Sequence, residues 1–96
     1  MTKDITDKLS FDENPTLKVK GEVIEVQADA MNVLKIMGLF DGEKSESKAT
    51  LEAAEMLFSK KDREKIKGMK LQFKDYVTLV QEAINIAVSD EEEGEK

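Results

Sequence analysis

The residues able to do chemistry in this chain are carboxylates, amines and hydroxyls, because the sequence contains neither Cys nor His. Those two absences remove the commonest nucleophile, the commonest general base and the soft metal ligands. Acidic residues gather in segments 41–47 and 90–96, and basic residues gather in segment 60–74. No pair of carboxylates has a spacing that distinguishes it from surface charge. We therefore expect no catalytic residue, no cofactor and no metal site.

The polar stretch 41–47 resembles two ligand loops in part. Lys44-Ser45 after Gly42 is similar to the end of a phosphate-binding loop, but Glu43 stands where a Gly should precede the Lys, and no strand leads into it. The acidic residues of the stretch suggest a calcium loop, yet the alternating acids and the closing Glu are missing. Both comparisons favour a solvated loop.

The basic segment is the one charge feature that could form a site. On a short helix its cations point in several directions, and no aromatic residue is interleaved for base stacking. We interpret it as a solvated connector that attracts the acidic C-terminal segment or an acidic partner. The net charge of −6 disfavours nucleic acid as a ligand. The cations are Lys60, Lys61, Arg63, Lys65, Lys67, Lys70 and Lys74.

The element that organises the chain is a predicted helix over residues 71–88, the longest segment with apolar residues at helical spacing. Its apolar face is too broad to remain in water, so other elements must cover it. Gln72 is the expected N-cap, with a hydrophobic staple between Leu71 and Tyr76. The predicted apolar stripe is Phe73, Tyr76, Val77, Val80, Ala83, Ile84, Ala87 and Val88, widened by Leu79 and Ile86.

Segment 17–27 predicts a β-hairpin. With Gly21-Glu22 as a type II′ turn, apolar residues oppose apolar ones and a cation opposes an anion. The expected pairs are Val19 with Ile24, Leu17 with Val26, and Lys18 with Glu25. A lone hairpin is marginally stable, so this one should pack on the helices.

Three shorter helices are expected between the hairpin and the long helix. The first covers residues 30–39 after an Asp29 cap, with Ala30, Val33, Leu34, Met37 and Phe40 facing inward. The second runs from a Ser45 or Ser47 cap to about Phe58, with Leu51, Ala54, Leu57 and Phe58 buried and with Ala49 and Ala53 permitting close approach. The third covers residues 60–67, capped by Ser59, anchored by Ile66 and closed by Gly68.

The fold class that follows is α+β and mainly α, an N-terminal hairpin packed on three or four helices with the last helix longest. We expect a flexible N-terminal arm over residues 1–14, a single domain over 15–89 and a disordered acidic tail over 90–96. The absence of a signal-peptide-like or membrane-length apolar run predicts a soluble cytosolic protein without a membrane partner.

The order of these segments resembles the tail assembly chaperones of long-tailed phages and prophages of Gram-positive bacteria. The resemblance covers residues 15 to 90 and rests on order, spacing and apolar pattern rather than on an invariant motif. It is carried by a hairpin LKVKGEVIEVQ, a helix ending LFDG, a helix ending MLFSKKDREKIKGM, and LQFKDYVTLVQEAINIAV before an acidic end.

The resemblance implies a non-enzymatic protein of the bacterial host cytoplasm that binds the tape measure protein during tail morphogenesis and is absent from the mature virion. The major tail protein is a further implied partner, and we expect weak homo-oligomers. The candidate partner-binding residues are Met31, Ile36, Met56 and Leu79, since so small a core cannot bury every apolar face.

Two alternatives come from other classes. One is a small acidic regulatory adaptor or inhibitor that binds a host protein and whose acidic tail mimics nucleic acid. The other is a nucleic-acid-binding protein that uses the basic segment. Gene order separates the first alternative from the chaperone, and salt-dependent binding to DNA or RNA would support the second.

Overall fold

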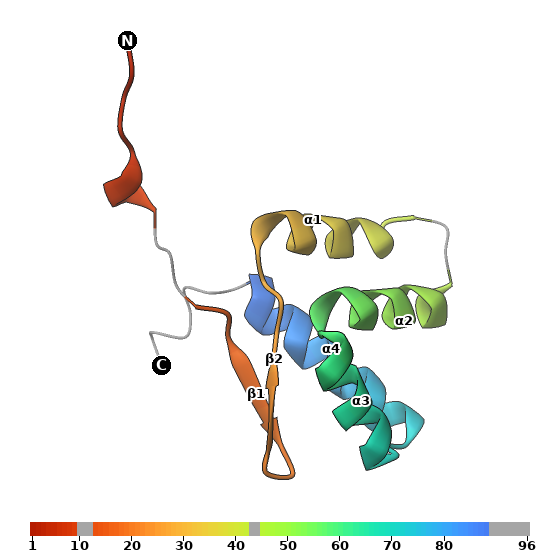
Figure 1. Cartoon of the computed structure of the whole chain (residues 1–96). Coiled ribbons are helices and arrows are strands. Elements are labelled where there is room, and N and C mark those ends of the chain that lie inside the picture. The colour runs from red at the N-terminus through yellow and green to blue at the C-terminus, as the bar shows by residue number, and fades with distance from the viewer. Residues whose placement is uncertain (10–12, 43–44, 89–96) are drawn as a thin grey trace.

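The computed structural model describes residues 1–9, 13–42 and 45–88, which form a two-stranded hairpin followed by four helices (Figure 1). The predicted fold class is confirmed, and the last helix is the longest. The predicted acidic tail lies outside the described residues. The strands are β1 (Thr16–Val19) and β2 (Glu22–Glu25); the helices are α1 (Ala30–Leu39), α2 (Glu46–Leu57), α3 (Lys60–Met69) and α4 (Phe73–Val88).

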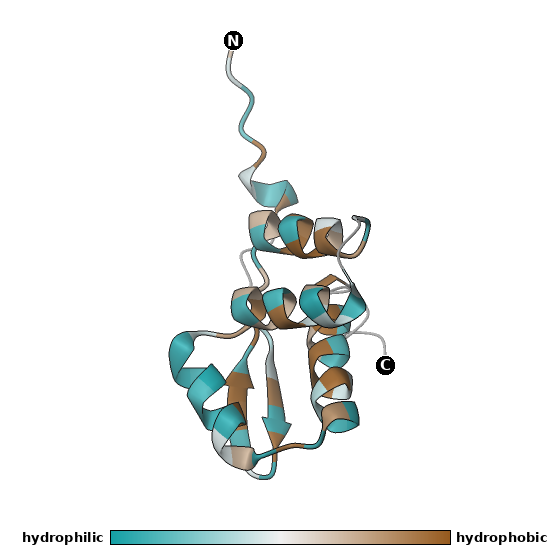
Figure 2. Cartoon of the chain, turned by 90° about the vertical axis from the view of Figure 1, so that its right-hand side faces the viewer, coloured by the Kyte–Doolittle hydropathy of each residue, from teal (hydrophilic) through white to brown (hydrophobic). Residues whose placement is uncertain are grey.

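The helices meet around one core. α1 and α2 run in opposite directions, one above the other, and both contact α4 (Figure 1). The hairpin stands between α3 and α4 (Figure 2). The apolar residues that these elements bury together are Ile24, Val26, Ile36, Ala53, Ala54, Leu57, Phe58, Ile66, Leu79, Val80 and Ala83.

The hairpin register differs by two residues from the prediction. Leu17 pairs with Ile24 and Val19 with Glu22, so the turn residues are Lys20 and Gly21. Both have positive φ, 50° and 81°, as a type I′ turn requires and a type II′ turn does not. A two-residue shift preserves the side-chain alternation, so the apolar residues still face the core although the predicted pairs and turn are wrong.

The predicted limits of α1 are confirmed, but its predicted inner face is wrong except at Val33. The Asp29 carboxylate caps the helix by accepting a bond from the Asn32 N–H at 3.4 Å. Ile36 is the residue that α1 buries, while Val33 and Leu39 are half-buried. The predicted inward residues Ala30, Leu34, Met37 and Phe40 are exposed instead.

The side chain of Asn32 explains why α1 turns this way. Its amide Nδ2 donates to the Gln27 carbonyl and to the Met56 carbonyl, each at 2.8 Å. The Gln27 N–H also donates to the Leu57 carbonyl at 2.7 Å. These bonds join the start of α1 to the end of α2, and they fix a polar residue on the side of α1 that faces the protein.

α2 and α3 begin at the predicted serines. Ser45 caps α2 and Ser59 caps α3, each accepting an N–H at 3.2 Å from the residue three positions later. The predicted buried residues of α2 are confirmed except Leu51, which is 57% exposed. α3 continues past Gly68 to Met69, and Lys70, at φ 53°, takes the left-handed position that we predict for Gly68.

α4 begins at Phe73, and the Tyr76 N–H bonds to the Gln72 carbonyl at 2.9 Å. The centre of the predicted stripe is confirmed, because Leu79, Val80 and Ala83 are buried. Its ends are not covered: Phe73 is 74% exposed and Val88 is exposed as well.

The N-terminal residues 1–9 lie away from the helices and contain one 3-10 turn, Thr6–Lys8 (Figure 1). All of them are exposed. Asn14 lies at the end of the predicted arm, yet its side chain donates to the Glu25 carboxylate at 2.8 Å and accepts from the Ala28 N–H at 3.3 Å. Asn14 is therefore attached to the hairpin rather than to the arm.

Candidate functional site

The described residues contain no cluster suited to a metal ion. Across residues 1–9, 13–42 and 45–88, no three Asp or Glu side chains converge at a distance from which they could share a cation. In the same residues, every buried side-chain nitrogen and oxygen has a hydrogen-bond partner. No helix among them is long and apolar enough to cross a membrane.

The four predicted partner-binding residues do not share a surface. Met31 is 64% exposed, as a contact residue should be, and Met56 is half-buried. Ile36 and Leu79 are 2% and 8% exposed, because they fill the core between α1, α2 and α4. The expectation that Ile36 and Leu79 remain accessible is wrong.

The outer face of α1 exposes three neighbouring apolar side chains. Met31, Leu34 and Met37 occupy successive turns of the helix and are 64%, 62% and 51% exposed. We call these three side chains the α1 outer face. The polar residues of α1 are Asn32, which points inward, and Lys35. α1 thus carries apolar side chains on the side that packs and also on the side that does not.

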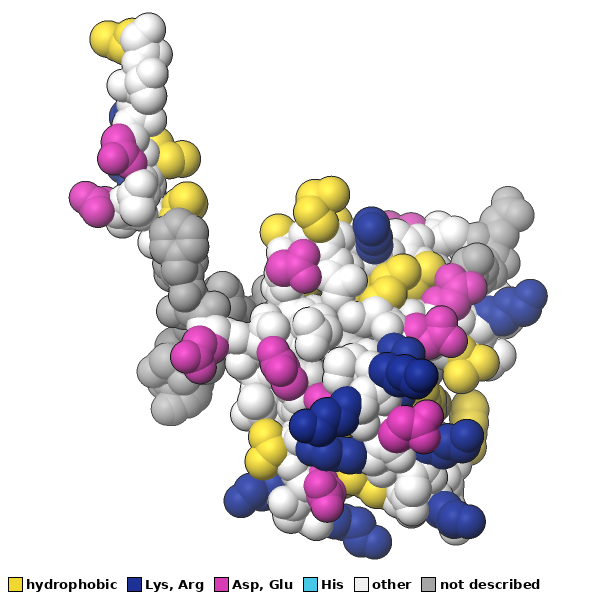
Figure 3. Space-filling model, in the orientation of Figure 1, with side chains coloured by type: hydrophobic (Ala, Val, Ile, Leu, Met, Phe, Trp, Pro, Cys, Tyr) yellow, Lys and Arg dark blue, Asp and Glu magenta, His cyan; other side chains and the backbone are white. Residues whose placement is uncertain are grey.

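The space-filling view shows the contrast between the two ends of the molecule (Figure 3). Apolar side chains are visible over α1, whereas Lys and Arg side chains dominate the region of α3. A helix that is apolar all round is normally covered on both sides. A partner helix on the α1 outer face would cover three exposed apolar side chains, Met31, Leu34 and Met37.

A hollow of about 410 Å³ opens between α3 and the start of α4. Phe58 and Ile66, both buried, form its floor together with half-buried Leu71 and Tyr76. We call this the α3/α4 hollow. Its remaining lining residues are Arg63, Lys67, Lys70 and Phe73.

Tyr76 reports on the environment of this hollow. Burial raises the pKa of its phenol above the ordinary value, the nearby Glu55 carboxylate raises this pKa further, and the Arg63 guanidinium partly offsets both effects. The neutral phenol is therefore the favoured form in the fold. A raised pKa does not suit Tyr76 as a nucleophile or base near neutral pH, so we treat the hollow as a binding surface.

A second, smaller hollow of about 290 Å³ lies between the end of α1, the start of α2 and α4. Phe40, Val80 and Ile84 contribute apolar atoms to it, and Glu46, Thr50, Gln81 and Asn85 contribute polar ones. The Thr50 hydroxyl is already bonded to the Glu46 carbonyl at 2.8 Å. This hollow has no dominant chemical character that would select a ligand.

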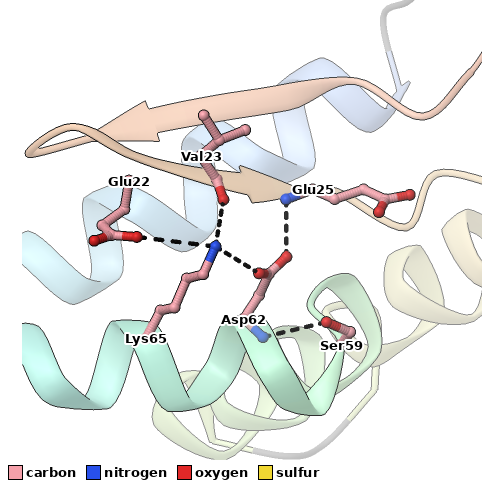
Figure 4. Close-up of polar contacts among 6 residues, drawn as sticks. All are labelled: Glu22, Val23, Glu25, Ser59, Asp62 and Lys65. Carbon is pink, nitrogen blue, oxygen red and sulfur yellow. Dashed lines mark hydrogen bonds and ion pairs between the residues drawn. The ribbon is translucent and has the colours of Figure 1, made fainter.

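Two cations of the basic segment, Arg63 and Lys65, are bonded within the fold. Lys65 Nζ donates to the Val23 carbonyl at 3.1 Å and lies 3.6 Å and 3.9 Å from the carboxylates of Asp62 and Glu22 (Figure 4). Arg63 donates to the carbonyls of Glu55 and Phe58 at 3.0 and 2.8 Å. These two residues hold the fold. The prediction of a purely solvated connector is therefore wrong for Lys65 and Arg63.

The stretch 41–47, which partly resembles two ligand loops, is described only at its ends, since Glu43 and Lys44 are not among the described residues. Ser45 uses its hydroxyl to cap α2. Asp41 and Glu46 are exposed.

Sequence reasoning missed Leu34, Met37 and Phe73 as surface residues, because their helical spacing equally predicts burial. The composition of α1 could have identified the first two: a ten-residue helix with only Asn32 and Lys35 as polar residues has no side suited to water. Comparison with known proteins adds no assignment, as the chain matches no family model, no curated protein and no solved structure.

Proposed function

We propose that this chain is a non-enzymatic tail assembly chaperone of a long-tailed phage or prophage, and that it binds the tape measure protein through the α1 outer face. The observation that carries the proposal is the exposure of Met31, Leu34 and Met37 on one side of a helix whose other side packs in the core. The partner is named by the resemblance of residues 15 to 90 to that family.

The chemistry of the face suits a helical target. Side chains at i, i+3 and i+6 contact the apolar stripe of another helix in the manner of helix-in-groove recognition. Two of the three are Met residues, whose flexible thioethers adapt to irregular partners. Such a surface accepts many apolar helical segments of one target rather than a single sequence.

Weak single contacts are sufficient for this role. Copies bound along one long helical protein, and in weak contact with one another, gain affinity through effective concentration. In this proposal the chaperone covers apolar segments in the host cytoplasm until tail tube subunits, built from the major tail protein, replace it. The chaperone is then absent from the finished virion.

Co-expression with the neighbouring long open reading frame tests the proposal. We expect the long protein to be soluble, and to copurify at moderate salt, only when this chain is present. Equal solubility with and without this chain, and no copurification, would show that the assignment is wrong. Copurification with a host protein in the absence of the long protein would favour the alternative of a small acidic adaptor.

A further inference from the structure

The α3/α4 hollow combines an apolar floor with a cationic rim. The side chains of its floor residues, Phe58, Ile66, Leu71 and Tyr76, carry one polar atom, the Tyr76 hydroxyl. The volume of about 410 Å³ falls within the range of roughly 300–1,000 Å³ that is usual for ligand pockets. One large side chain can therefore enter, but a whole folded domain cannot.

The rim is positive, although the Glu55 carboxylate, which does not line the hollow, is near enough to act on Tyr76. Lys67 and Lys70 are exposed, and neither forms a salt bridge within the described part of the chain. The Arg63 guanidinium is fixed at the same rim by the carbonyls of Glu55 and Phe58, so its position does not depend on a ligand. No Asp or Glu of the described residues lines the hollow.

Phe73 completes the surface. It is the first residue of α4, lines the hollow and is 74% exposed, the largest exposed fraction of any aromatic side chain among the described residues. Aromatic residues and Arg are enriched at protein interfaces, and polar residues such as Lys belong to their solvent-accessible rims.

We propose that the α3/α4 hollow binds an acidic peptide segment of a partner protein that carries one aromatic or branched aliphatic side chain. The apolar side chain enters the hollow against Phe58 and Ile66 and is covered by Phe73. Its flanking carboxylates lie at the rim, where they form charge-assisted hydrogen bonds with Lys67 and Lys70. The two parts of the ligand match the two parts of the site.

The acidic end of this chain does not have the required composition. Segment 89–96, SDEEEGEK, supplies carboxylates but no apolar side chain that could fill the floor. Nucleic acid is disfavoured by the net charge of −6, which repels a long polyanion. A short acidic peptide is affected mainly by charges within about 10 Å at moderate salt, where the rim cations dominate.

This inference is independent of the proposed chaperone function. None of the residues that line the hollow belongs to α1, so the two surfaces can be changed separately. Loss of peptide binding with tape measure binding retained, or the reverse, identifies which of the two proposals has failed.

The test is fluorescence anisotropy with a short fluorescein-labelled peptide of Glu and Asp around a single central Trp. We expect saturable binding to the intact protein that weakens as salt is added. The same peptide with Ser in place of Trp, and the unlabelled peptide SDEEEGEK, should not compete with it. If either of these peptides displaced the labelled peptide as effectively as the unlabelled Trp peptide does, the site would recognise charge alone. That result would overturn the proposal.

Matched variants locate the site. Lys67→Glu with Lys70→Gln should weaken peptide binding at least about tenfold. Lys60→Glu with Lys61→Gln makes the same charge change at exposed positions of the same helix, outside the hollow, and should weaken it far less. Equal loss in both double variants, or no loss in either, would contradict the proposed site.

A second pair of variants tests the apolar part of the α3/α4 hollow. Phe73→Ser should also weaken binding about tenfold, whereas Leu51→Ser, at an exposed position of α2, should not. Both positions are exposed, so circular dichroism should show both variants folded. The proposal would be overturned if Phe73→Ser bound the peptide with unchanged affinity, or if the intact protein did not bind the Trp peptide. It would also be overturned if a single-stranded DNA oligonucleotide displaced the labelled peptide at a lower concentration than the unlabelled Trp peptide does.

Discussion

The carboxylate of Asp62 accepts a hydrogen bond from the backbone N–H of Glu25 at 2.9 Å, which joins α3 to β2 across 37 positions of sequence. Asp62 is 6% exposed, and its second oxygen lies 3.6 Å from Lys65 Nζ. Lys65 in turn binds the Val23 carbonyl on the same edge of β2. α3 therefore covers the free edge of a strand that would otherwise be open to pairing with another chain.

Replacement of Asp62 by Ala should reduce the free energy of unfolding by about 1–3 kcal/mol, because the Glu25 N–H becomes an unpaired, partly buried donor. Urea denaturation followed by circular dichroism measures this change. Glu64→Ala is the matched control, since Glu64 is an exposed acid on the same helix. If the two variants lose the same stability, the contact between α3 and β2 does not stabilise the fold.

Leu57 and Leu51 give a second matched pair on α2, with exposed fractions of 0% and 57%. Leu57→Ala should cost about 2–5 kcal/mol through lost burial and the cavity it leaves. Leu51→Ala should cost less than about 0.5 kcal/mol. Denaturant titration of both variants distinguishes the observed orientation of α2 from the predicted one, in which both side chains are buried.

Lys20 is a long side chain in a left-handed conformation, at φ 50°, where Asn is better tolerated. Lys20→Asn creates the Asn-Gly sequence that type I′ turns favour and should stabilise the protein by up to about 1 kcal/mol. Lys18→Asn, in the adjacent strand, should destabilise it because Asn is unfavourable in strands. Thermal unfolding of both variants checks the register, since the predicted Gly21-Glu22 turn gives no reason for Lys20→Asn to stabilise.

The phenol of Tyr76 should make stability depend on pH in alkali. Its pKa is raised in the fold, so the stabilisation is complete below the unfolded pKa of about 10 and is lost as the pH rises through the folded value. Tyr76→Phe should remove this part of the dependence while leaving the titration of the lysines. The chain contains one Tyr and no Trp, so absorbance of tyrosinate measures the folded pKa directly; a value at or below that of free tyrosine would contradict the account.

The helix starts could be predicted because they depend on local chemistry. Asp29, Ser45 and Ser59 each satisfy a free N–H three residues later, a pattern visible in any short window of sequence. The hairpin register could not be fixed in the same way. A shift of two residues keeps Leu17 and Ile24 on the same face, so alternation alone does not choose between the two turns.

The orientation of α1 depends on tertiary contacts. Ile36 and Leu34 are equally apolar, and periodicity does not say which of them packs in the core. Asn32 decides it through bonds to two carbonyls that become neighbours only after folding. The burial of Asp62 is hidden for the same reason: in sequence it reads as an ordinary acid in the first turn of a capped helix.

The central claim is that the α1 outer face binds the tape measure protein, and its most direct measurement is the amount of the neighbouring long protein that copurifies with variants of this chain. Leu34→Glu places a charge in the middle of the face, and Leu51→Glu places the same charge on an exposed position of α2. The account predicts that copurification falls by about tenfold or more with Leu34→Glu and is unchanged with Leu51→Glu. Undiminished copurification with a folded Leu34→Glu variant would contradict it.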